Sequence, residues 1–190
     1  VVNEESQGTP LGLSAPTDAE GEALTINVVT VGGLPTLGQI TLANGTPLQL
    51  GQELTLQDLT GLKFNAPLDY NGSDPVGDFR YQVNDGAGQS NSVVIGSVTL
   101  QVLPINDAPI AASKSLTVAE ESTGNALGLA APSDVDGNPL TLVVTALPTL
   151  GQITLSDGAA VSLGQSLSSA QLTGLKYNAP AEYDGVAPAG

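Results

Sequence analysis

The residues of this chain that could do chemistry are almost all oxygen donors. The 190 residues include 19 Asp and Glu but no His and no Cys, which excludes imidazole bases, thiolate nucleophiles, zinc sites of the usual kind and disulfides. Carboxylate, amide and carbonyl oxygens suit hard cations, and calcium above all, because it accepts about six to eight oxygen ligands in loose geometry. We therefore expect Ca²⁺ as the leading ligand.

One loop carries the most specific acidic pattern. Asp134 and Asp136 alternate ahead of Gly137, so that two carboxylates can face one ion, and an earlier loop repeats the spacing as Asp18 and Glu20. Turn-forming Asp and Gly give the same composition without a metal, and this alternative stays open.

Three other polar patterns are weaker. Glu4-Glu5 recurs as Glu120-Glu121, and each pair fits either metal ligands or solvated acids near the end of a strand. The Asn-Asp-Ala-Pro segment at 106–109 reads as a linker stiffened by its Pro, and it fits either a ligand-bearing junction or a generic polar connector. The third pattern, at 68–72, places Asp69 and Asn71 on either side of a Tyr.

Composition excludes several other functions. Only 4 Lys and Arg oppose the 19 acids, giving a net charge of −15, so a phosphate-binding surface for nucleic acid is excluded. No apolar run approaches the roughly 20 residues that cross a bilayer, and we expect no direct membrane insertion. Paired carboxylates could serve a glycoside hydrolase, but the chain has no Trp to stack on a sugar ring. We therefore expect no enzyme.

An internal repeat decides the domain organisation. Residues 34–77 align with 147–190 without a gap, and 26 of the 44 positions are identical. Three extra residues stand in the first copy around Asn27, Gly32 and Gly33, where we expect a loop. We predict a first repeat at 1–105, a linker at 106–109 and a second repeat at 110–190. We interpret the chain as an internal fragment, in which the first repeat lacks its first strand and the second lacks its last strands.

Patterning predicts strands and turns rather than long helices. Phe79, Tyr81 and Val83 alternate with polar residues, which indicates a half-buried strand, and Asn44-Gly45 is a hairpin signal. Residues 92–103 read as a long closing strand, 24–31 and 140–145 as copies of an earlier one, and 54–59 as a helical turn. The predicted fold class is all-β, a tandem pair of Greek-key β-sandwiches of the cadherin or immunoglobulin type.

The chain resembles the bacterial cadherin-like tandem repeats of giant secreted, RTX-type adhesins, which are related to chondroitin sulfate proteoglycan repeats. The resemblance rests on the Leu-Pro-Thr-Leu-Gly-Gln-Ile block at 34–40 and 147–153, and on the segments 58–65 and 78–86. The linker at 106–109 is similar to the DxNDNxP linker of cadherins. Cadherin-type repeats bind calcium where two repeats meet, and the resemblance implies the same here.

The resemblance also implies how the ligands divide between neighbouring repeats. Asp85 would serve a preceding junction. Pro104, Ala108 and Asn71 depart from the cadherin pattern and weaken three ligand positions, so we expect one or two ions and weaker binding. The implied ligands are Glu4, Glu5, Asp69, Asn71, Asn106, Asp107, Asp134, Asp136 and Asn138.

These expectations describe a calcium-rigidified spacer of a large secreted adhesin at a bacterial cell surface. The spacer would support cell adhesion or biofilm attachment indirectly, by holding a distal binding domain away from the cell. Its partners would be neighbouring repeats of the same chain, whereas the distal ligand is not encoded here. The alternative is a sandwich module that binds a glycan or protein directly, against which few aromatic residues and a single Arg argue.

Overall fold

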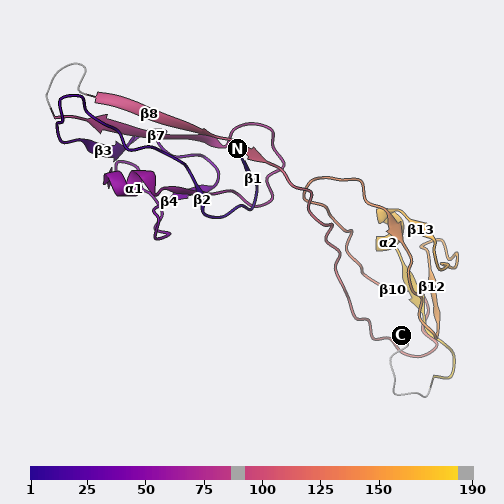
Figure 1. Cartoon of the computed structure of the whole chain (residues 1–190). Helices are drawn as coiled ribbons and strands as arrows, with labels where there is room; N and C mark the ends of the chain where they lie inside the picture. Colours follow the sequence, from indigo (N-terminus) through magenta and orange to yellow (C-terminus); the bar gives the residue numbers. More distant parts are fainter. Residues whose placement is uncertain (87–92, 184–190) are drawn as a thin grey trace. The chain divides into compact units, whose positions relative to one another are not determined.

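The computed structural model describes residues 1–86 and 93–183, and it shows an all-β protein. The chain divides into two compact units, Val1–Asn106 and Asp107–Gly190 (Figure 1). Strands are short because 23 Gly and 13 Pro interrupt the chain, and the two described helices have five residues each. The predicted all-β sandwich class is confirmed.

The first unit is built from three sheets. The largest has the antiparallel order β5 (Glu53–Leu54), β3 (Thr25–Val28), β7 (Gly77–Asn84) and β8 (Val93–Leu100). A second sheet has the order β2 (Thr9–Pro10), β6 (Lys63–Asn65) and β4 (Gln39–Thr41). The third sheet is a parallel pair, β1 (Val2–Asn3) and β9 (Val102–Leu103). Helix α1 (Leu56–Thr60) follows β5 directly.

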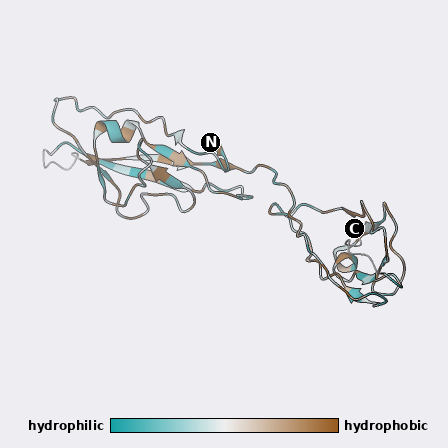
Figure 2. Cartoon of the chain, turned by 90° about the horizontal axis from the view of Figure 1, so that it is seen from below, coloured by the Kyte–Doolittle hydropathy of each residue, from teal (hydrophilic) through white to brown (hydrophobic). Residues whose placement is uncertain are grey.

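The predicted local structure of the first unit is largely confirmed. In β7, Phe79 is fully buried and Arg80 is exposed, as predicted, whereas residues 81–84 are all half-buried. Figure 2 shows both apolar and polar colours on the strands. Gly45 N–H donates to the carbonyl of Leu42 at 2.9 Å and closes the Asn44-Gly45 turn. The predicted closing strand is split into β8 and β9, and its first residue, Ser92, lies outside the described residues.

The core of the first unit lies between its sheets. Phe64 of β6 is 1% exposed and packs with residues of β3, β4 and β7 in one apolar cluster. Gly38, at φ +75°, permits this packing, because a Cβ there would fall 2.6 Å from Phe64 Cζ. Gly151 repeats the arrangement, with a Cβ falling 2.4 Å from the Tyr177 hydroxyl. The repeated glycines therefore make room for an aromatic ring in each unit.

The second unit repeats part of this architecture. One sheet has the order β10 (Asn125–Ala126), β14 (Lys176–Asn178) and β12 (Gln152–Thr154). The other pairs β11 (Leu142–Val143) with β13 (Ser166–Leu167), which leads into α2 (Ser169–Thr173). The strands β11 and β13 match β3 and β5 in register, since Leu142 pairs with Leu167 as Ile26 pairs with Leu54.

Backbone hydrogen bonds locate the extra residues of the first copy. Val28 N–H donates to the Gln52 carbonyl, and Val144 N–H donates to that of Gln165, so the copies remain in register through Val28. Five residues, 29–33, then stand where the second copy has only two, 145–146. The insertion therefore follows β3, as the glycines at 32 and 33 indicated, and does not include Asn27 within that strand.

Candidate metal-binding carboxylates

Glu4 is a buried carboxylate at the end of β1. Its backbone N–H donates to the Leu103 carbonyl at 2.9 Å, which continues the parallel pairing of β1 with β9. Its side chain is 2% exposed and accepts hydrogen bonds from the backbone N–H groups of Tyr70 and Ile105. These donors offset the cost of burying the charge. Each oxygen accepts one of these bonds and retains a lone pair for a cation.

Glu5 and Asp69 form a second acidic pair in the first unit. Both have left-handed backbones, with φ of 61° and 53°, which costs about 1 to 2 kcal/mol for a residue with a side chain. Glu5 N–H donates to the Pro67 carbonyl at 3.0 Å, which ties the two turns together. A carboxylate oxygen of Glu5 and one of Asp69 lie within 4.8 Å of each other. Two exposed negative groups are thus held close together, as calcium coordination requires.

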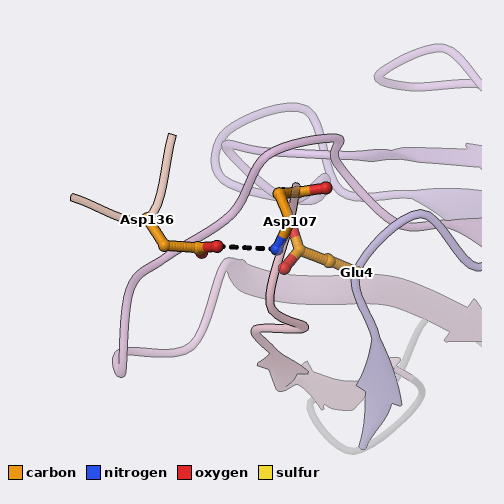
Figure 3. A group of neighbouring side chains, drawn as sticks. All are labelled: Glu4, Asp107 and Asp136. Carbon is orange, nitrogen blue, oxygen red and sulfur yellow. Dashed lines mark hydrogen bonds between the residues drawn. The ribbon is translucent and has the colours of Figure 1, made fainter. Parts of the chain in front are cut away.

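The second unit holds a further acidic pair, Asp107 and Asp136. Asp107 N–H donates to the Asp136 carboxylate at 2.7 Å, which is the dashed line in Figure 3. Both side chains are half-buried, and an oxygen of each lies within 4.8 Å of an oxygen of the other. The hydrogen bond fixes the start of the second unit against the Asp136 loop.

Asp134 makes a different kind of contact. Its carboxylate accepts the N–H of Asn138 at 3.1 Å, and Asp18 does the same in the first unit with the N–H groups of Glu20 and Glu22. These bonds are side-chain caps of a turn. Both acids therefore stabilise their own loops, and a metal-ligand role for Asp134 stays a prediction.

The predicted amide ligands lie at exposed positions. Asn71 follows Tyr70, Asn106 ends the first unit, and Asn138 follows the Asp134 loop. The structure thus brings together Glu5 with Asp69 and Asp107 with Asp136, within their own units. Asp85 lines a separate cavity of about 340 Å³ in the first unit, together with Asp18.

The second unit repeats the unusual backbone of the first. Glu121 and Glu182 have φ of 58° and 54°, and Glu121 N–H donates to the Pro180 carbonyl at 3.1 Å. Glu120, which corresponds to Glu4, is exposed. The repeat therefore encodes the turn itself, whereas burial of its first Glu depends on what packs over it.

Sequence reasoning missed two features of these carboxylates. It gave no role to the N–H groups of Tyr70 and Ile105, although both bind Glu4. It also missed the left-handed backbone of Glu5 and Asp69. The available signal was the recurrence of an acid at each of these two positions in the second copy, as Glu121 and Glu182.

This sheet arrangement and this repeat define an immunoglobulin-like module. The sequence matches the bacterial Ig domain family over residues 1–97 and again over 106–185, and the chain therefore belongs to that family as a tandem pair of its domains. No curated protein matches the chain. Domains of this family are typically structural modules without catalysis, and they are common in surface proteins. The finer relation to cadherin-like, RTX and proteoglycan repeats stays a prediction.

The described residues contain no helix of the length and apolarity needed to cross a bilayer.

Proposed function

We propose that this chain is a calcium-rigidified spacer of a large bacterial surface adhesin. Calcium would bind the acids Glu4, Glu5 and Asp69 of the first repeat, and Asp107 and Asp136 of the second. The observation that carries the proposal is the burial of Glu4. Its charged side chain accepts the N–H of Ile105, in the segment that leads to the next repeat. The spacer would hold a distal binding domain away from the cell, and its direct partners would be neighbouring repeats.

Hydrogen bonds within each unit tie these acids to one short segment. Glu4 binds the N–H of Ile105, and Asp136 binds the N–H of Asp107. Only Asn106 separates Ile105 from Asp107, so covalent geometry keeps the two backbone nitrogens within about 7 Å of each other. Each set of acids is therefore bonded to a backbone N–H within residues 105–107.

Electrostatics favours a bound cation at these acids. Two carboxylates about 4 Å apart repel by about 4 kcal/mol at an effective dielectric near 20. Glu5 with Asp69 and Asp107 with Asp136 are such close pairs, in a chain with a net charge of −15. A divalent cation would turn this repulsion into attraction and would restrict motion at residues 105–107. Calcium fits best because the donors are all oxygens.

Thermal unfolding of the whole chain in excess calcium and in chelator tests the proposal. A ligand at 100 times its Kd stabilises by about 2.7 kcal/mol, which corresponds to about 10 °C or more in the Tm of a domain this size. The double variant Asp107→Asn and Asp136→Asn keeps oxygen acceptors but removes two charges, and should lose most of the shift.

A matched control removes two charges elsewhere. Glu53→Gln with Asp157→Asn alters an exposed strand residue and a turn residue outside the acidic pairs, and should retain the full calcium shift. Absence of any calcium shift in the unaltered chain would refute the calcium part of the proposal. If calcium binds but small-angle scattering shows the same spread of dimensions with and without it, the rigid-spacer role is wrong.

A further inference from the structure

Two Asn-Gly pairs occur in the first repeat, and the second repeat has Asp-Gly at both equivalent positions. Asn44-Gly45 corresponds to Asp157-Gly158, and Asn71-Gly72 corresponds to Asp184-Gly185. In an Asn-Gly pair the backbone nitrogen can approach the side-chain amide with little hindrance, because the residue that supplies the nitrogen has no Cβ. The repeat therefore keeps the Gly and accepts either the amide or the acid before it.

Gly72 is required by the packing of its own loop. A Cβ on Gly72 would fall 2.7 Å from Cζ and 2.7 Å from the hydroxyl oxygen of Tyr70. The Tyr70 hydroxyl donates to the Asp74 carbonyl, which closes the loop around this glycine. A larger residue would displace the ring, so Asn71 keeps an unhindered neighbour.

The hairpin turn at Asn44 is held against attack on its amide. Gly45 N–H donates to the Leu42 carbonyl at 2.9 Å, and the Asn44 side-chain oxygen accepts the N–H of Thr46 at 2.9 Å. For attack, the Gly45 nitrogen must lose its proton and the Asn44 side chain must turn toward it. Both hydrogen bonds oppose this change.

Asn71 lies in a segment without these restraints. Residues 71–73 form neither a strand nor a turn, and Asn71 is exposed to water. The N–H of Gly72 donates no hydrogen bond to any residue that the structure describes. Attack by the Gly72 nitrogen therefore breaks no backbone hydrogen bond of that group.

We propose that Asn71 is a site of spontaneous deamidation, which converts its amide to a carboxylate as the protein ages. The Gly72 nitrogen loses its proton and attacks Cγ of Asn71, which forms the new C–N bond of a cyclic imide. The bond from Cγ to the side-chain nitrogen breaks, and this nitrogen takes up the proton and leaves as ammonia. Water then opens the ring at either carbonyl and gives aspartate or isoaspartate, each with one more negative charge than asparagine.

The new charge joins the acidic group of the first unit. Asn71 directly follows Tyr70, whose N–H donates to Glu4, and Asp69 is only two residues away in the chain. Glu5 and Asp69 already hold two carboxylates close together, so a further charge beside them increases the repulsion within the group. The inference does not depend on calcium, because the reaction uses only the chain and water.

Incubation of the whole chain at neutral pH, followed by tryptic digestion and tandem mass spectrometry, measures conversion at each Asn separately. Cleavage after Lys63 and Arg80 places Asn44 and Asn71 in different peptides. A sample digested before incubation corrects for conversion during digestion. We expect conversion at Asn71 to be at least about tenfold faster than at Asn44, because two hydrogen bonds protect Asn44.

Unfolding provides the matched control. In guanidinium chloride both Asn residues precede Gly in an unrestrained chain, so the two rates should converge. The variant Asn71→Gln keeps an amide but lengthens the side chain, and should lose the acidic species that ion-exchange chromatography resolves after incubation. Conversion in the folded chain that is absent at Asn71, or no faster there than at Asn44, would overturn the proposal. An unchanged ratio of rates in the denaturant would show that the fold does not select Asn71.

Discussion

At the scale of single residues, Glu4 and Glu120 show how one sequence position acquires two roles. Both begin a Glu-Glu pair at equivalent places in the repeat. Glu4 is 2% exposed and accepts two backbone N–H groups, whereas Glu120 is exposed. Glu4 bonds to β9 through the Leu103 carbonyl and to the segment after it through the Ile105 N–H. Burial, rather than residue type, therefore determines how much this position contributes to the free energy of unfolding.

Glu4→Ala should destabilise the first unit by about 3 kcal/mol, because two part-buried N–H donors lose a charged acceptor. Glu120→Ala, the matched exposed substitution, should change stability by no more than about 0.5 kcal/mol. Urea unfolding of both variants in the presence of chelator measures the difference without any contribution from calcium. Equal effects of the two substitutions would show that the Glu4 contacts are not stabilising.

At the scale of elements, the two short helices are capped by the same motif with different chemistry. The N–H and hydroxyl of Thr55 donate to the Asp58 carboxylate ahead of α1, at 3.0 and 2.7 Å. Ahead of α2, Ser168 N–H donates to the neutral Gln171 amide at 2.8 Å. The hydroxyl and then the N–H of Thr55 hold the pKa of Asp58 below its ordinary value of 3.8. Only the first cap can therefore titrate.

The α1 cap should weaken in acid while the α2 cap does not. Since the pKa of Asp58 is lowered on folding, its contribution is fully present above the ordinary value of 3.8 and is lost as the pH falls through the lower folded value. Hydrogen exchange at Leu59 and Leu172, measured at neutral and acid pH and corrected for intrinsic rates, should show extra opening only at Leu59.

Asp58→Asn isolates this effect. Asp78 shares the acid window, because the Arg80 guanidinium and then the Thr99 hydroxyl lower its pKa. The variant should remove the acid-dependent opening at Leu59 while leaving any contribution from Asp78. Persistence of that opening in the variant would assign it to another group.

Much of the element structure could be predicted from local sequence. The Asn44-Gly45 turn and the helical turn of α1 each depend on neighbouring residues, and each is confirmed. The alternation predicted for β7 is found only at Phe79 and Arg80. The burial of Glu4 could not be predicted, because it depends on pairing with Leu103. The left-handed backbone of Glu5 could not be predicted either, since Glu rarely adopts it. The proposed calcium ligands stay predictions from residue type and resemblance.

At the scale of the whole molecule, two related sequences form cores of unequal size. The first unit buries residues from all of its sheets in one cluster, including Ile26, Phe64 and Phe79. The corresponding cluster of the second unit consists of Val161, Leu167 and Leu175, with partly buried neighbours, among the residues described. Because apolar burial contributes about 25 cal/mol per Å², the first unit should be the more stable of the two.

Two equivalent amides provide a direct test of this inequality. Val28 N–H and Val144 N–H make the same bond, at 2.9 and 3.0 Å, to Gln52 and Gln165. Their local geometry is matched, so a difference in protection reports the surrounding core. We expect hydrogen exchange at Val28 to be at least about tenfold slower than at Val144. Equal protection would mean that the smaller cluster stabilises the second unit as well as the larger one does the first.

The parallel pairing of β1 with β9 has a mechanical consequence for the first unit. The two strands run in the same direction, so tension along the chain enters at the start of β1 and leaves beyond the end of β9. Such tension slides the strands past each other and loads the bonds from Val2 N–H to Gln101 and from Glu4 N–H to Leu103 together. Bonds loaded in shear must break at once, whereas bonds pulled apart from one end break in turn. The Glu4 side chain also accepts the N–H of Ile105. This bond joins the segments after β1 and after β9, where tension would first act.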